Sequence, residues 1–203
     1  MWSAIAAAVV IVVGGVSVVL VTAKPSLKAS PAVPATPART ASGATDAPPW
    51  PAPADPTARA KAAGLGMLSS EGSVEHIHSH LTVTVDGQPV PVPALIGVDE
   101  NAQTLSPLHT HDASGILHVE SPVKAQFTLG QVFTEWNVAL SSKRIGSLDT
   151  ASGDTITAFV NGKKVSGDPA AITLADRADI DIVVTRNGTK ATPPPPFTCP
   201  SGY

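Results

Sequence analysis

The chain has 203 residues, a formal net charge of −3, six histidines and one cysteine. Because it contains no block of basic residues, the composition argues against nucleic acid and against an anionic membrane surface as partners. The lone Cys199 excludes an intrachain disulfide framework and a Cys-x-x-Cys motif, and its proline-rich surroundings do not suggest a nucleophile.

The N-terminal segment predicts a membrane anchor. Residues 2–22 carry no charge and are almost wholly apolar, and a helix of that length can span a bilayer. A secretory signal cleaved after Ala23 is the alternative, because Val21-Thr22-Ala23 fits a small-x-small cleavage site. The apolar run is longer than a usual signal core and no basic residue precedes it, which favours an uncleaved anchor over residues 1–23.

The charges that flank this segment bear on its orientation in the membrane. Lys24 and Lys28 follow the span, and the positive-inside rule then argues weakly against export of the remainder. The family resemblance described below points the other way. We therefore expect a single-pass protein of the cell membrane with its domain outside the cytoplasm, or a secreted protein if cleavage occurs.

Two further segments have the composition of linkers. Residues 24–65 are dominated by Pro, Ala, Ser and Thr, which bury little apolar surface, and they predict a disordered or semi-rigid stalk. Residues 188–203 predict a second extended, proline-rich tail. The remaining residues, 70–187, are enough for one independently folding domain.

The first half of that domain predicts β-strands. Apolar residues alternate with threonines from Leu81 to Val85, and Asp86-Gly87 then indicates a hairpin turn. Prolines at 89, 91 and 93 withhold backbone donors, so the returning strand is predicted to be irregular or at an edge. Residues 97–114 are expected to form a loop, and residues 115–121 a third strand.

The second half predicts one helix and further strands. In the segment 127–140, Thr128 and Gln131 form a capping box, and an apolar stripe follows at helical spacing. Asn161-Gly162 indicates a second hairpin, and residues 178–185 a final strand. This order predicts an α+β fold, a small mixed sheet with one packing helix, for which a β-grasp-like arrangement is one form.

All six histidines lie between residues 76 and 118. Because neighbouring side chains of a strand face opposite sides, the histidines of the segment 76–85 lie opposite Leu81 and Val83. In the third strand, His118 and Glu120 likewise lie opposite its apolar residues. The histidines are therefore predicted to lie outside the apolar core, on an open polar face of the sheet.

If the first and third strands are neighbours, these side chains converge with the two histidines of the loop. Clustered imidazoles with a carboxylate are ligands of Zn²⁺, Cu²⁺, Ni²⁺ or non-haem Fe²⁺. Asp112, Glu75 and Glu120 are candidates to orient a ligating ring. The predicted metal ligands are His76, His78, His80, His109, His111, His118, Glu120 and Asp112.

Cu(II) or Zn(II) fits this ligand set best, with copper slightly favoured on an exported histidine-rich surface. Both methionines and Cys199 lie outside the cluster, which argues against a Cu(I) site. Two interpretations without a metal remain open. The histidines can form a solvated polar face, or they can act as a pH-sensitive switch, because imidazoles gain charge just below neutral pH.

Four segments resemble a group of functionally uncharacterised, membrane-anchored or secreted bacterial proteins that is frequent in actinobacteria. They read HIHSHLTVTVDGQPVPVPALIG, SPLHTHDASGILHVESP, FTLGQVFTEWNV and VNGKKVSGDP, and they fall within residues 72–184. The resemblance implies export and one small domain behind an N-terminal anchor, and it implies no particular activity. Members of that group often carry another histidine near the last strand, where this chain has Arg177.

Three functions are compatible with these residues. The favoured one is a membrane-anchored extracytoplasmic protein that captures or buffers Cu(II) or Zn(II), with an envelope protein as its partner. The second is a metal-dependent enzyme, cupin-like or hydrolytic, with Glu120 or Asp112 as general base. The third is an accessory subunit of an envelope complex with a structural metal. An open histidine face without a lid favours capture over catalysis, and the chain lacks Gly-x-Ser-x-Gly, P-loop and Rossmann motifs.

Overall fold

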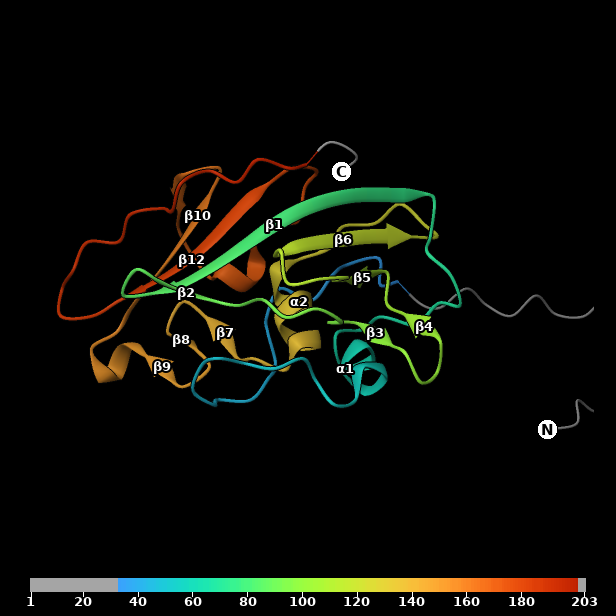
Figure 1. Cartoon of the computed structure of the whole chain (residues 1–203), viewed down its shortest axis with the longest axis horizontal. Coiled ribbons are helices and arrows are strands. Elements are labelled where there is room, and N and C mark those ends of the chain that lie inside the picture. The colour runs from blue at the N-terminus through green and yellow to red at the C-terminus, as the bar shows by residue number, and fades with distance from the viewer. Residues whose placement is uncertain (1–32, 201–203) are drawn as a thin grey trace, which may run out of the picture. The chain divides into compact units, whose positions relative to one another are not determined.

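The structure is a computed structural model that describes residues 33–200 (Figure 1). The predicted anchor over residues 1–23 lies outside the described residues. Within residues 33–200, no helix has the length and apolar character needed to cross a membrane.

The described chain folds as an α+β domain with two α-helices and a mixed sheet, which confirms the predicted fold class; the β-grasp-like arrangement stays a prediction. The elements, in chain order, are α1 (Pro56–Ala62), β1 (Glu75–Val85), β2 (Gln88–Val90), β3 (Val98–Asp99), β4 (Thr104–Leu105), β5 (Leu108–His109), β6 (Ile116–Ser121), α2 (Leu129–Trp136), β7 (Leu140–Ser141), β8 (Arg144–Ile145), β9 (Leu148–Asp149), the 3₁₀ turn η1 (Thr150–Ser152), β10 (Thr155–Val160), β11 (Lys163–Val165), the 3₁₀ turn η2 (Pro169–Ala171) and β12 (Asp179–Thr185).

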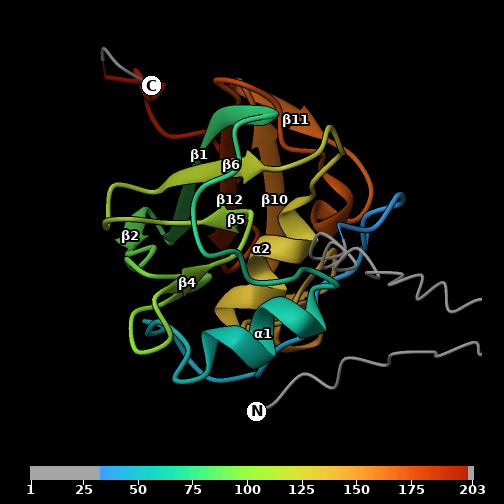
Figure 2. The same ribbon diagram turned by 90° about the vertical axis from the view of Figure 1, so that its right-hand side faces the viewer.

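The main sheet has seven strands in the order β11-β10-β12-β1-β6-β5, with β2 also paired to β1. The long strand β1 is parallel to β12 and antiparallel to β6. Both predicted hairpins are confirmed, since the turn residues Asp86-Gly87 and Asn161-Gly162 all have positive φ, as type I′ turns require. Figures 1 and 2 show α2 packed under the sheet and α1 on the far side of α2.

The helix α2 forms where the sequence predicts it and fills the core. The Thr128 side chain accepts from the Gln131 backbone, and the Gln131 side chain accepts in return from the Thr128 backbone. Asn137 ends the helix in the left-handed conformation. The buried apolar face of α2 packs against the face of the sheet that points away from the histidines. The helix contributes Leu129, Val132, Phe133 and Trp136, and the sheet contributes Leu81, Val83, Leu117, Val119, Ile180 and Ile182.

The prediction of a disordered linker over residues 24–65 is wrong for residues 33–65. This segment contains α1, which Asp55 caps and which packs against α2. Trp50 is buried and meets Trp136 edge to face, with ring centroids 5.6 Å apart. Alanines and single aromatic residues in a proline-rich segment show no periodicity that would predict a helix or a strand. Trp50 and Ala60 nevertheless supply apolar surface that is buried in the domain.

The loop predicted over residues 97–114 also contains more regular structure than its sequence indicates. It holds β3 and β4, which pair with each other, and β5, which pairs with β6. These strands are two residues long, too short for an alternating pattern to be visible. The pairing of β5 adds His109 to the main sheet.

One buried carboxyl group departs from the apolar character of α2. Glu135 is fully buried, and in the part of the chain that the structure describes neither of its side-chain oxygens has a hydrogen-bond partner. Burial raises the pKa of Glu135 from 4.5 to about 8, while the nearby Ser106 hydroxyl and Arg59 guanidinium oppose the shift only in part. The folded protein therefore holds this side chain as a neutral acid at neutral pH.

This shift predicts how stability changes with pH. The folded state binds the Glu135 proton more tightly than the unfolded state does. The contribution of this proton to the free energy of unfolding is therefore complete below pH 4.5 and is lost as pH rises toward 8. We expect the gain in unfolding free energy on Glu135→Gln to increase with pH across this window, at up to about 1.4 kcal/mol per pH unit. Denaturant unfolding at several pH values measures it, with Glu100→Gln at the exposed surface as control. A difference that does not vary with pH would contradict the prediction.

Candidate metal centre

The register of three strands brings histidines into one row. β1 pairs with β6 so that His78 lies opposite His118. On its other edge β6 pairs with β5, and His109 lies opposite the same His118. In the next row, His76 lies opposite Glu120. Opposed residues on one face have Cβ atoms about 4.5–5.5 Å apart, so imidazoles from three strands meet around His118.

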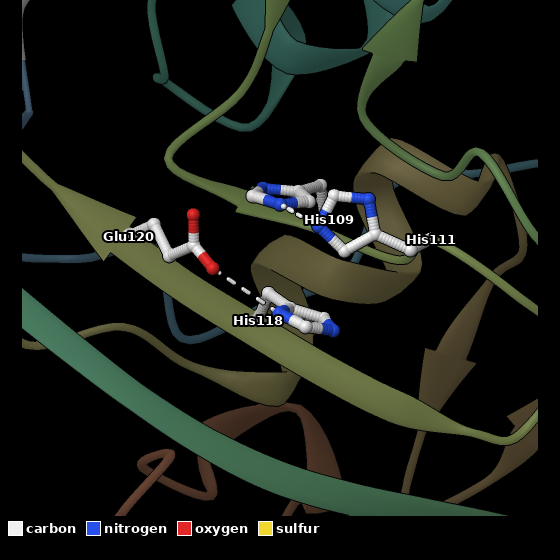
Figure 3. A group of neighbouring side chains, drawn as sticks. All are labelled: His109, His111, His118 and Glu120. Carbon is white, nitrogen blue, oxygen red and sulfur yellow. Dashed lines mark hydrogen bonds and ion pairs between the residues drawn. The ribbon is translucent and has the colours of Figure 1, made fainter. Parts of the chain in front are cut away.

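One group of four side chains is arranged as a set of metal ligands. His109, His111, His118 and Glu120 each offer one ligand atom, and these atoms lie within 4.8 Å of one another. Figure 3 shows the His109 and His111 rings close together and the Glu120 carboxylate directed toward the His118 ring. The ring of His111 is nearly perpendicular to that of His118, with centroids 4.4 Å apart.

Two atom pairs within this group have the spacing of ligands on a shared ion. The Nε2 atoms of His109 and His111 are 3.2 Å apart, and so are His118 Nδ1 and Glu120 Oε1. Around a tetrahedral ion with bonds of about 2.0–2.1 Å, neighbouring ligand atoms are roughly 3.3–3.4 Å apart. Each pair therefore has a separation close to that of two ligands on one ion. An ion held by these residues would take the place of the proton within each pair.

The ring of His109 is held in the orientation that a ligand needs. Its Nδ1–H donates to the backbone carbonyl of Ser106, 2.9 Å away, which leaves Nε2 to face His111. A backbone carbonyl on the second ring nitrogen is the usual arrangement for a metal-bound imidazole, because it sets both the tautomer and the direction of the ring.

The surroundings of His109 and His118 keep these two imidazoles neutral, which is the state that binds metal. Burial, with the neighbouring His111 and His109, lowers the pKa of His118 to about 3. Burial likewise lowers the pKa of His109 to about 4, and the Ser106 carbonyl offsets part of that change. The pKa of His78 is lowered by burial and by His76.

Glu120 has a buried oxygen without a partner. The residue is 4% exposed, and its Oε2 atom forms no hydrogen bond within the described structure. Burial raises the pKa of Glu120, and the negative charge of Glu71 adds to this shift. A buried carboxylate oxygen left unpaired is costly, and a cation at this position would satisfy it. The residues present therefore fit a divalent metal ion.

The expectation of an open histidine face is wrong. His78, His80, His109 and His118 are all buried, at 1–7% exposure, although they lie opposite the apolar core as predicted. They form a second, polar layer on the other side of the sheet. His76 and His111 remain exposed. The periodicity of a strand shows which face a side chain occupies, but not what later covers that face.

Four of the predicted ligands lie outside this group: His76 and His78 form a second group with Glu120, whereas His80 and Asp112 belong to neither group. His80 is held by Asp179 on Nδ1, at 2.9 Å, and by the Ser114 carbonyl on Nε2, at 3.1 Å. Phe197, from the proline-rich tail, stacks on its ring with centroids 3.6 Å apart. Asp112 is exposed, and its carboxylate accepts from the Ser114 backbone. Among residues 33–200, neither side chain belongs to a group of ligand atoms that could share an ion.

One carboxylate near the centre has no counterpart in the sequence-based prediction. Glu71 Oε1 lies 3.7 Å from His111 Nε2, and the side chain is half exposed. The chain before β1 carries it there, because Leu68 bonds to Leu105 and Gly72 bonds to the carbonyl of Glu120. Glu71 stands outside every strand, so no alternating pattern marks it.

The position of this segment depends on Gly72. A Cβ atom at residue 72 would collide with the backbone of Ser121 and Pro122. We expect Gly72→Ala to move the segment off β6 and to cost about 1–3 kcal/mol of unfolding free energy. Denaturant unfolding measures the change, with the exposed neighbour variant Ser73→Ala as control. Equal stability of the two variants would show that the segment does not pack against β6 in this way.

A scan against models of protein families, a search of curated proteins and a search of solved structures each found no match. The chemistry of the centre is that of two groups of His and Glu side chains, largely buried, that could hold a metal ion.

Proposed function

We propose that this domain binds a divalent metal ion through His109, His111, His118 and Glu120. The observation that carries the proposal is the pair of 3.2 Å contacts, His109 Nε2 to His111 Nε2 and His118 Nδ1 to Glu120 Oε1, within a single group of four ligand atoms. The unpartnered buried oxygen of Glu120 supports it, and so do the lowered pKa values of His109 and His118.

The donor set supports Zn(II) or Cu(II) as the ion. It consists of three imidazole nitrogens and one carboxylate oxygen, and sulfur ligands are absent from the group. The tetrahedral spacing is the one that Zn(II) prefers, since Cu(II) favours tetragonal sites with shorter ligand separations. Cu(II) nevertheless binds a given set of nitrogen and oxygen ligands more tightly than Zn(II), so both ions compete for this site.

The mode of action that we propose is capture or buffering rather than catalysis. Four protein ligands saturate a tetrahedral ion, which is the arrangement of sites that hold a metal. The half-exposed His111 provides contact with solvent, and the buried His109 and His118 enclose the ion once it is bound. An envelope protein that delivers or receives the ion is the partner this role requires.

We further propose that the domain acts outside the cytoplasm, attached to the cell membrane by the apolar residues 2–22, or secreted if the chain is cleaved after Ala23. The uncharged, apolar character of that segment supports the proposal. The group of exported proteins that the four sequence segments resemble points in the same direction. Capture in that compartment would supply the ion to the envelope.

Elemental analysis tests the metal proposal. The full chain, purified in mild detergent without chelators and dialysed against Zn(II) or Cu(II), is expected to retain bound metal. Combined His109→Ala and His111→Ala should remove the ion of this site and so lower the metal content, because two of its four ligands are lost. The control is His80→Gln, a buried histidine on the same face of β1 that lies outside the group. Equal metal content in all three proteins would overturn the proposal.

A reporter fused to the C-terminus tests the location. We expect a reporter that is active only outside the cytoplasm to give a signal in cells, because the anchor places the domain there. A reporter active only in the cytoplasm serves as the matched control and should stay silent. The reverse result would remove export and extracytoplasmic capture from the proposal, while the metal centre would be unaffected.

A further inference from the structure

We propose that the domain has a second metal site, formed by His76, His78 and Glu120, and that Glu120 bridges the two ions. The proposal rests on the proposed function, since Glu120 is also a ligand of the first site. The ligand of this second site is a divalent cation of the same class, with water or a small anion completing its coordination.

The second site is a separate group of ligand atoms. His76, His78 and Glu120 each offer one atom, and these atoms also lie within 4.8 Å of one another. His76 and His78 occupy the same face of β1, and their rings meet edge to face with centroids 4.9 Å apart. The His76 Nε2 atom lies 3.5 Å from Glu120 Oε1.

Glu120 is positioned to serve both groups. The register places it directly opposite His76 in β1, and its Oε1 atom is 3.2 Å from His118 of its own strand. Its Oε2 atom is buried and has no partner within the described structure. Oε1 is the atom that contacts both groups, at 3.2 Å from His118 Nδ1 and 3.5 Å from His76 Nε2. With two oxygens, a carboxylate can serve two ions at once, and ions in two-metal sites are about 3.5–4 Å apart.

The two groups are also adjacent through their rings. His78 and His118 lie opposite each other in β1 and β6, and their ring centroids are 4.7 Å apart. The ligands of the two sites are therefore neighbours on the same face of the sheet. His76, His78, His118 and Glu120 lie on paired strands of one sheet, so the spacing between the two groups is set there by backbone pairing, whereas His111 comes from the loop after β5.

The two sites differ in coordination and in access to solvent. The first has four protein ligands, whereas the second has three, which leaves an open position of the kind found in sites that exchange ligands. The His76 side chain is 57% exposed, so the second ion lies at the entrance to the centre. Repulsion between two divalent ions makes the second bind more weakly, and the bridging Glu120 reduces that repulsion.

Titration of the full chain with Zn(II), in mild detergent and followed by calorimetry and elemental analysis, tests the proposal. We expect two ions per chain, one bound tightly and one at least tenfold more weakly. Combined His76→Ala and His78→Ala should leave one tightly bound ion. The control His80→Gln, in the same strand, should leave two.

The outcomes separate this inference from the proposed function. One ion in both the natural chain and the double variant would overturn the second site and leave the first intact. Loss of all metal in the double variant would show that the two groups share a single ion, which also overturns it. No ion in the natural chain would overturn both proposals.

A spectroscopic measurement tests the bridge itself. With Cu(II) in both sites, ions joined by one carboxylate couple magnetically, so the paramagnetic resonance signal should account for less copper than elemental analysis finds. In the double variant of His76 and His78, signal and copper content should agree. A full, uncoupled signal from two bound Cu(II) ions would contradict the bridging role of Glu120.

Discussion

The candidate centre depends on the pairing register of β1, β6 and β5. This register sets His78, His118 and His109 side by side and puts His76 opposite Glu120. Because side chains alternate along a strand, a slip of one residue would turn every histidine of the slipped strand toward the apolar core. The register is held by that core, since Leu117 and Val119 must face α2 for their surface to be buried. Hydrophobic packing on one face of the sheet therefore determines the chemistry on the other.

Burial of the polar side chains costs free energy of folding, and burial of the apolar side chains on the other face of the sheet offsets that cost. Four histidines and Glu120 are buried with few compensating charges, and the protein responds by holding the imidazoles of His109 and His118 neutral. A neutral imidazole with a fixed orientation keeps one unprotonated nitrogen, which makes it a good ligand for a cation. The layer is thus arranged so that it could hold an ion, and the burial of its polar groups would then preorganise the site.

Segments of low sequence complexity contribute to this layer and to the core. The tail stacks Phe197 on His80, and the backbone of Phe197 donates to Asp179. The segment before β1 brings Glu71 to the edge of the centre, and Trp50 closes the core against Trp136. Proline-rich composition lowers the cost of ordering these segments, because the chain already favours extended conformations. A few apolar or charged side chains then suffice to attach them to the domain.

Local rules on the sequence determined much of this protein. The Asp-Gly and Asn-Gly turns, the capping box of α2 and the alternation in β1 and β6 each act over a few residues, so the strands, the helix and the side of the sheet that bears the histidines could be predicted. They also predicted every member of the two groups of candidate ligands in the described residues, namely His76, His78, His109, His111, His118 and Glu120.

Only the tertiary structure decided the rest, because it depends on contacts between residues far apart in the chain. It buried four of the histidines, separated His80 and Asp112 from the group, and brought Glu71 beside it. It also made Glu120 the carboxylate shared by two groups. Periodicity assigns a residue to a face, whereas the distance between two ligands on that face is set by strand order and register, which no local pattern encodes.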